Sequence, residues 1–435
     1  MDMNTIIISL AAVLGLYMAW NIGANDVANS MADAVGSKAL SIRNAVIAAG
    51  ICEFAGAVLV GSHVTDTVRK GIVDPAVLAN LPGMTTHDAA VILVIGMSAA
   101  LLSAAFWLNM STLFGMPVST THSIVGAVAG FGVVAAGWDA VNWNKMGQIV
   151  ASWFISPIMG GLLSFLIFIY IRKAILRHEQ PARAAIRHVP IIVFLMTSVV
   201  LLATIYKGLQ HVTGNIAILQ GGGSFWVSIG LALAASVISY FLVKRKLDNL
   251  DKISISKQLE AVERVFVPMV IVSSCSVAFA HGANDVANSV GPLAAIVNIL
   301  QTGVVDMKVP VPLWILTLGG AGIVMGLATY GYRVMMTVGT KITEITPSRG
   351  VAADIAASAT VLACTRLSLP VSTTHTLVGA ILGIGLARGL GGINRRIVGS
   401  IFGSWLFTVP AAAVMSIIFF IIGKIIFFDI IDGLI

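Results

Sequence analysis

The chain has 435 residues, of which 57% are apolar and only 10% are charged. Soluble globular proteins contain about 25% charged residues, so this composition excludes an ordinary soluble enzyme or binding domain. The net charge of +7 would suggest a nucleic-acid partner in a soluble protein. In so apolar a chain it has to be interpreted through membrane topology instead, and we expect no nucleic acid to bind.

Apolar segments recur along the whole chain, and a bilayer-spanning helix needs about 18 or more apolar residues. We therefore predict an all-α polytopic membrane protein with about twelve transmembrane segments. The first segment follows no basic leader and is expected to be retained as a helix. Two segments are Gly-rich and interrupted by Pro117 and Pro370, so they are predicted to be discontinuous helices. The twelve segments are 5–22, 44–62, 89–107, 110–137, 146–171, 189–206, 224–243, 265–281, 312–330, 351–365, 367–387 and 397–428.

Basic residues predict the orientation of these segments. The connections 172–188 and 244–264 carry five and six Lys or Arg residues, and two predicted helices separate them. Both connections therefore lie on one face, which the positive-inside rule makes cytoplasmic. Alternation along the chain then places 19 of the 26 Lys and Arg residues inside. The sequence predicts a multi-pass protein of the cell membrane with both termini outside.

Two motifs are written twice in the chain. The octet Gly-Ala-Asn-Asp-Val-Ala-Asn-Ser occupies 23–30 and 282–289, and the hexapeptide Pro-Val-Ser-Thr-Thr-His occupies 117–122 and 370–375. We divide the chain into a first repeat (1–171), two connecting helices with basic loops (172–264) and a second repeat (265–435). An odd number of crossings separates equivalent points, so the repeats are predicted to be inverted, a common plan of secondary transporters. Counting 110–137 as a re-entrant hairpin would break this parity.

Each hexapeptide has the features of a helix start that binds an anion. Pro suits the first helical turn, and Ser and Thr cap it. Unpaired N–H groups, the positive end of the helix dipole and three hydroxyls then make an anion site. Simple capping is the alternative for a single copy. Because two copies can face one another across a pseudo-twofold axis, we predict a tetrahedral oxyanion between them. Its ligands would be Ser119, Thr120, Thr121, Ser372, Thr373 and Thr374.

Each octet lies where its apolar helix is expected to end, and it offers amides and one carboxylate. Hard oxygen ligands of this kind, aided by carbonyls of unwound backbone, suit an alkali cation. An ionisable residue at membrane depth is a functional candidate by default. The alternative is a structural cluster of polar side chains that ties helices together. The predicted sodium ligands are Asn25, Asp26, Asn29, Asn284, Asp285 and Asn288.

Two aspartates beside an anion would repel it, and neither motif contains Lys or Arg. Bound cations would remove this conflict, so the anion is expected to bind well only after the cations. Glu53 and Asp354 are isolated acids in apolar segments and are further candidates for coupling or proton relay. Internal alignment places Ile323 opposite Glu53 and Met97 opposite Asp354. His122 and His375 are expected to support the hexapeptide turns by hydrogen bonding.

The paired octets, the paired hexapeptides and Ile-Thr-Pro-Ser-Arg-Gly at 345–350 resemble the inorganic phosphate transporter (PiT) family over essentially the whole chain. The resemblance implies symport of inorganic phosphate with sodium or protons by alternating access, and it suggests a homodimer. By the family pattern Asn25, Asp26, Asn284 and Asp285 are the signature residues, and Ser119 and Ser372 the matching serines. The chain departs from some relatives at Met97, where they carry an acid.

We therefore predict a sodium-driven phosphate symporter that carries transported sodium ions and needs no cofactor. Proton-coupled phosphate symport and a sulfate permease of the same fold remain open. An intramembrane hydrolase using Ser119 and His122 lacks an evident orienting acid. A passive anion channel would use fixed basic residues, and an ATP-driven pump would need a Gly-x-x-x-x-Gly-Lys-Ser/Thr stretch, which is missing. The chain is not expected to be an enzyme.

Overall fold

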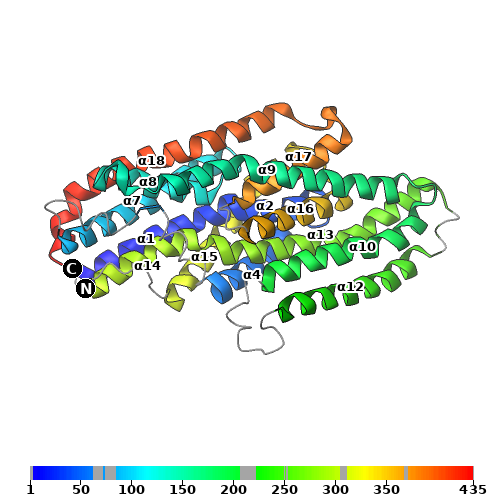
Figure 1. The fold of residues 1–435 in the computed structure, drawn as a ribbon, viewed down its shortest axis with the longest axis horizontal. Coiled ribbons are helices and arrows are strands. Elements are labelled where there is room, and N and C mark those ends of the chain that lie inside the picture. The colour runs from blue at the N-terminus through cyan, green and yellow to red at the C-terminus, as the bar shows by residue number, and fades with distance from the viewer. Residues whose placement is uncertain are drawn as a thin grey trace.

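The computed structural model describes residues 3–61, 72–73, 85–205, 222–248, 250, 253–303, 311–366 and 371–434. Long helices lie side by side along one axis, and both termini lie at the same end of it (Figure 1). The connections from α9 to α10 and from α12 to α13 lie at the opposite end (Figure 1). Nine helical stretches of the described residues are long and apolar enough to cross a membrane. The prediction of an all-helical membrane protein is confirmed.

The helices fall into two series with two helices between them. The first series is α1 (Met3–Ile22), a π-helical turn (Gly23–Val27), α2 (Ala28–Ser30), α3 (Ala32–Gly36), α4 (Ile42–Val60), α7 (Thr86–Leu113), α8 (Thr120–Ala136) and α9 (Trp143–Ile171). Between the series lie α10 (Pro181–Ala203) and α12 (Gly223–Leu247). The second series is α13 (Ile255–Asp285), α14 (Ala287–Thr302), α15 (Leu313–Met336), α16 (Pro347–Arg366), α17 (Thr373–Arg388) and α18 (Arg395–Asp432).

The structure corrects several predicted segment boundaries. α7 runs without interruption from Thr86 to Leu113, so it contains the predicted segment 89–107 and the beginning of 110–137. The remainder of 110–137 is the 17-residue α8. At 1.5 Å per residue α8 is about 26 Å long, less than the roughly 30 Å of a hydrocarbon core. The counterpart of α8 is α17, with 16 residues; Pro370, predicted to interrupt this segment, lies outside the described residues.

The prediction that helices end at the octets is wrong. The first octet opens with a π-helical turn, and the helical backbone continues to Gly36. The second octet begins inside α13, which ends at Asp285, and α14 starts at Ala287, still within the octet. α14 is absent from the twelve predicted segments, although 13 of its 16 residues are buried. π-helical turns inside helices occur frequently at functional sites. Each octet is thus an irregularity within a continuing helix.

Helices of each series pack on helices of the other series in equivalent pairs, as expected for a pseudo-twofold axis. α1 packs on α15 of the second series, and α13 packs on α4 of the first. In the same way α8 packs on α18, and α17 packs on α9. α1 runs from the N-terminal end toward the middle of the molecule, whereas α13 runs from the opposite end (Figure 1). This opposite direction is the arrangement that inverted repeats predict; the boundaries at 171 and 265 stay predictions.

Glycines at equivalent positions of the two repeats allow the backbones of these paired helices to come into direct contact. A Cβ at Gly23 would stand 1.8 Å from the carbonyl oxygen of Ile323, and one at Gly282 would stand 2.3 Å from that of Glu53. Both contacts are impossible for any other residue, because the obstacle is backbone. The pairing of Gly23 with Ile323 and of Gly282 with Glu53 agrees with the internal alignment of Ile323 with Glu53.

We expect Gly326→Ala to prevent stable folding. Its Cβ would stand 1.7 Å from the backbone oxygen of Trp20, so α1 and α15 would have to separate along the octet turn. Gly230→Ala in α12 is the matched control, because nothing lies within 4 Å of a Cβ there. Yields of monodisperse protein after detergent extraction should fall at least tenfold for Gly326→Ala and stay unchanged for Gly230→Ala. Equal yields would contradict the close approach of the two helices.

Candidate ion and substrate site

The two short helices α8 and α17 begin inside the molecule at the hexapeptides. Ser119 is the N-cap of α8, and its Oγ accepts a hydrogen bond from the backbone N–H of His122 at 3.3 Å. Ser372 caps α17 in the same way through His375 N–H at 3.2 Å. Both serines are buried. The predicted helix starts are therefore confirmed as local structure, and their anion-binding role stays a prediction.

Asn25 holds the connection between α7 and α8 in place. Its Nδ2 donates to Thr112 Oγ1 at 2.9 Å and to the carbonyl of Met116 at 3.0 Å, and its Oδ1 accepts from Val118 N–H at 3.0 Å. All hydrogen-bonding groups of this amide thus bind the end of α7 and the connection to α8, including Val118 within the hexapeptide. In this structure Asn25 positions the start of α8, and its predicted sodium contact stays untested.

The carboxylate of Asp26 accepts hydrogen bonds from hydroxyl groups of both hexapeptides. Thr120 Oγ1 donates to Asp26 Oδ2 at 2.8 Å, and Thr374 Oγ1 donates to Asp26 Oδ1. Asn29 Nδ2 donates to Asp26 Oδ1 at 3.2 Å and to Thr374 Oγ1 at 3.1 Å. Thr120 and Asp26 come from the first repeat and Thr374 from the second. The structure thus brings together motifs that lie 348 positions apart.

Asp285 has a related but not identical set of partners. Thr373 Oγ1 donates to Asp285 Oδ2 at 3.4 Å, and Asn284 Nδ2 donates to Asp285 Oδ1 at 3.0 Å. Asn288 donates to Asp285 Oδ1 at 3.4 Å and to Thr121 Oγ1 at 3.2 Å. Asn288 therefore crosses to the hexapeptide of the other repeat, as Asn29 does. The twelve predicted ligands all gather at one place, and several hydroxyls bond directly to the octet carboxylates.

The pseudo-twofold axis passes between His122 and His375. Their ring centroids lie 4.8 Å apart in an edge-to-face arrangement. His375 stacks on Trp405 with a centroid distance of 3.7 Å, and His122 packs at 5.3 Å from the equivalent Trp153. The hydrogen bonds by which these histidines support the turns come from their backbone N–H groups, and their rings pack against each other and against the two tryptophans. The helix N-termini of the two repeats therefore meet inside the molecule.

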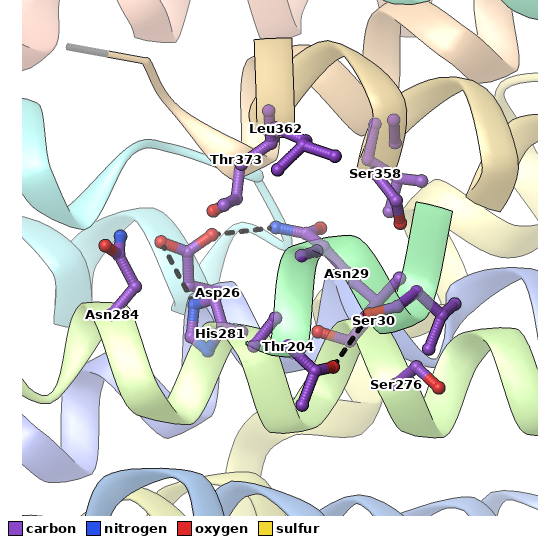
Figure 2. A pocket seen from close by; sticks show the side chains of 17 residues that line it. Asp26, Asn29, Ser30, Thr204, Ser276, His281, Asn284, Ser358, Leu362 and Thr373 are labelled. Carbon is purple, nitrogen blue, oxygen red and sulfur yellow. Dashed lines mark hydrogen bonds and ion pairs between the residues drawn. The ribbon is translucent and has the colours of Figure 1, made fainter. Parts of the chain in front are cut away.

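A cavity of about 70 Å³ opens beside Asp26. Because a water molecule occupies about 30 Å³ of the liquid, this space holds a small hydrated ion or a few waters. Figure 2 shows Asp26, Asn29, His281 and Thr373 facing it from the first octet, α13 and α17. α10 and α16 complete the wall with Thr204, Ser358 and apolar side chains. Among the described residues, no lysine or arginine lines this cavity.

His281 is the functional candidate that sequence reasoning missed. It lies just before the second octet, and its Nε2 is 2.7 Å from Asp285 Oδ2 and 3.8 Å from Asp26 Oδ2. These three side chains are buried, and one ligand atom of each lies within 4.8 Å of the others, close enough to hold a metal ion. Its position one turn before Asp285 was visible in the sequence. Ile22 occupies the equivalent position in the first repeat, so the comparison of the two repeats gave no reason to select His281.

The two isolated acids lie in different places. Glu53 reaches this site, because both of its carboxylate oxygens lie 3.1 Å from His281 Nδ1. Asp354 does not: its Oδ2 accepts hydrogen bonds from Ser273 and Ser274 of α13, at 2.5 and 3.0 Å. The prediction therefore groups two residues that the structure separates. Glu53 belongs to the centre, and Asp354 belongs to a second polar cluster.

The fold and this site define a membrane transporter. Inverted half-helices meet at a buried polar centre, and solute-binding centres of secondary transporters are built in this way. A model of the phosphate transporter family matches residues 22–416. The chain belongs to the phosphate transporter family, and it is a transporter rather than an enzyme.

Known relatives cover the whole chain. A Pyrococcus abyssi protein named "Putative phosphate permease" is 46% identical over 97% of this chain and 98% of its own length. The chloroplastic inorganic phosphate transporter 2-1 of Arabidopsis thaliana is 40% identical over 96% of this chain and 72% of its own length. A solved structure named "The sodium-dependent phosphate transporter" superposes with a TM-score of 0.83, at 41% identity, over 97% of this chain and 99% of that one.

Proposed function

We propose that the protein imports inorganic phosphate together with sodium ions by alternating access. Phosphate would lie between the N-termini of α8 and α17, held by the hydroxyls and N–H groups of the two hexapeptides. Sodium ions would lie at the octets, held by Asp26, Asp285 and the neighbouring asparagines. The similar solved structure is that of a sodium-dependent phosphate transporter, which supports this choice of ion.

The observation that carries the proposal is the charge at the centre. Three buried acids, Asp26, Asp285 and Glu53, lie around a single imidazole, that of His281. Even a protonated imidazole leaves an excess of negative charge, which would repel phosphate strongly in a medium of low dielectric constant. Cations at the carboxylates remove the excess, so phosphate affinity should depend on sodium. In this scheme the bonds from Thr120 and Thr374 to Asp26 are exchanged for bonds to the ions and the substrate.

The same carboxylates favour phosphate over sulfate. Phosphate at neutral pH carries protons and can donate a hydrogen bond to a carboxylate, whereas sulfate has no proton to donate. A sulfate ion at this centre would face acceptors without a donor, and an unpaired buried acceptor costs about 1–3 kcal/mol. Sulfate is the second candidate substrate, and proton coupling is the second candidate mechanism.

Uptake of radiolabelled phosphate into proteoliposomes tests the proposal. An inward sodium gradient at equal pH should drive accumulation, and a tenfold excess of sulfate should leave it unchanged. Accumulation driven by a pH gradient in sodium-free buffer would reject sodium in favour of protons. Inhibition by sulfate at concentrations similar to those of phosphate would reject the proposed selectivity.

Position in the membrane follows from the basic connections. We propose that the end holding the connections from α9 to α10 and from α12 to α13 faces the cytoplasm, because these connections are the most basic. Both termini would then lie outside the cell membrane. Cysteine labelling near residues 2 and 178 in intact cells tests this orientation, with only the first site expected to react. The homodimer implied by the family stays a prediction.

A further inference from the structure

Two of the three cysteines of the chain meet on neighbouring helices. Cys52 of α4 and Cys275 of α13 are both partly exposed, and their thiols lie within hydrogen-bonding reach of each other. The third cysteine, Cys364 of α16, is buried. Because α4 belongs to the first series of helices and α13 to the second, a bond between the two thiols would join the two halves of the molecule.

α4 and α13 run in parallel with their backbones in contact. Gly282 packs against Glu53, and Gly61, about two turns after Glu53, packs against Val286. Contacts that advance together along both helices require the helices to be parallel. Between them, a Cβ at Gly56 would stand 2.1 Å from a carbonyl oxygen of α13. A disulfide needs two Cα atoms about 4.4–6.8 Å apart, and helices in backbone contact come this close.

The register of this crossing places the two thiols opposite each other. The carbonyl that Gly56 approaches belongs to Phe279. Cys52 lies four residues before Gly56, and Cys275 lies four residues before Phe279. Residues four apart share one face of a helix, so one turn back along both helices leads from the backbone contact to the cysteine pair. The backbone register and the contact between the thiols therefore agree.

The equivalent crossing of α1 and α15 contains no thiol at these positions. The alignment of Glu53 with Ile323 places Gly322 opposite Cys52. The octet alignment places Leu16 opposite Cys275. A Cβ at Gly322 would stand 3.0 Å from Leu16 Cδ1, so the two positions meet in that half as well. The meeting point is a feature of the crossing itself, and its packing does not depend on sulfur.

The cysteine pair lies at the outer surface of the helix bundle. Ile51, next to Cys52, is 68% exposed, and Val272, about one turn before Cys275, is 53% exposed. Exposed apolar side chains of membrane-spanning helices contact lipid, through which a small uncharged oxidant such as hydrogen peroxide can diffuse. Oxidation of cysteine depends on exposure, so the pair is more open to such an oxidant than the buried Cys364.

We propose that Cys52 and Cys275 form a reversible disulfide that links α4 to α13 when the membrane is exposed to a peroxide. One thiol attacks a peroxide oxygen, which gives a sulfenic acid and one molecule of water. The second thiol then attacks that sulfur, the S–O bond breaks, and the hydroxyl leaves as water with the proton of the second thiol. Two thiols are oxidised to one disulfide while one peroxide is reduced to two waters. A dithiol reductant reverses the change by thiol–disulfide exchange.

The disulfide would fix the helix crossing beside the central site. Glu53 follows Cys52, and Ser276, which lines the central cavity, follows Cys275. The two cysteines lie far apart in the sequence, and a cross-link between distant residues stabilises the fold by restricting the unfolded chain. We therefore expect the oxidised protein to unfold at a temperature about 5 °C higher than the reduced protein.

Counting alkylated thiols in the purified full-length protein in lipid nanodiscs tests the proposal. The protein is treated with hydrogen peroxide, denatured and alkylated with N-ethylmaleimide, and its intact mass is measured. The parent should take up three maleimides before oxidation and one afterwards, with the loss of two hydrogen atoms, and dithiothreitol should restore all three. Cys364→Ser is the matched control and should change from two maleimides to none. Cys52→Ser and Cys275→Ser should each take up two maleimides before and after oxidation.

Each outcome supports or rejects the disulfide. Three alkylated thiols in the oxidised parent, or added oxygen atoms without loss of hydrogen, would overturn the proposal. A disulfide-linked dimer on non-reducing gels would show a bond between two copies and would overturn it as well. If a serine variant fails to fold, a digest of the oxidised parent decides, because it must contain a peptide pair joined through Cys52 and Cys275. An unchanged unfolding temperature after oxidation would reject the stabilising link between α4 and α13.

Discussion

Asp26→Asn and Asp285→Asn are each expected to abolish sodium-driven phosphate uptake while folded protein remains in the membrane. Asn keeps the shape of Asp and one acceptor for the hydroxyl of Thr120 or Thr373, but it removes the charge that would hold a cation. Breaking a buried charge pair costs about 3–5 kcal/mol, which corresponds to a loss of ion affinity of more than 100-fold. Uptake of labelled phosphate into proteoliposomes across a sodium gradient measures the effect.

The control for this prediction is Asp139→Asn, which makes the same chemical change at an exposed position and should leave uptake unchanged. Size-exclusion profiles in detergent establish that the inactive variants are folded. Sodium-dependent uptake retained by both single variants would remove Asp26 and Asp285 from the cation sites. Such a result would leave the charge argument for cation-dependent phosphate binding without support.

Glu53 and His281 are expected to behave as a unit in a double-mutant cycle. The close glycine contacts place Glu53 and Ile323 at equivalent positions, and His281 corresponds to Ile22 in the octet alignment. Glu53 and His281 thus correspond to Ile323 and Ile22 in the other half of the molecule. Removing one member of a buried ionic pair costs about 3–5 kcal/mol, whereas replacing both by apolar residues is often neutral. Thermal unfolding in detergent should therefore show the double variant Glu53→Ile/His281→Ile to be more stable than His281→Ile alone.

The single variant His281→Ile should be the least stable of the set, because it leaves three acids without the imidazole between them. Added sodium should raise its unfolding temperature more than that of the parent, since cations can replace the lost positive charge. Ile323→Val is the control at the equivalent position of the other half and should cost about 1 kcal/mol. Strictly additive effects of the two isoleucine substitutions would show that Glu53 and His281 do not interact.

Much of the architecture could be read from local pattern. Apolar length predicted the membrane class, and the duplicated motifs predicted that two broken helices start at a shared centre. Ser119 and Ser372 cap those helices as their residue type predicts. Helix boundaries were less accessible, because apolarity does not distinguish the end of one helix from the start of the next. The extra length of α7 and the whole of α14 were missed for this reason.

The sequence by itself determined the class of protein, the twofold duplication and the residues that supply chemistry, because these depend on composition and on spacing along the chain. Only the tertiary structure decided which of these residues meet. His281 joins Glu53 to Asp285, because glycine contacts such as that of Gly282 with Glu53 bring helices of opposite repeats together with one particular register. A polar residue that has no polar counterpart in the other repeat cannot be found by comparing the repeats. Its contact partner lies hundreds of positions away in the sequence, on a helix whose rotation is determined by packing.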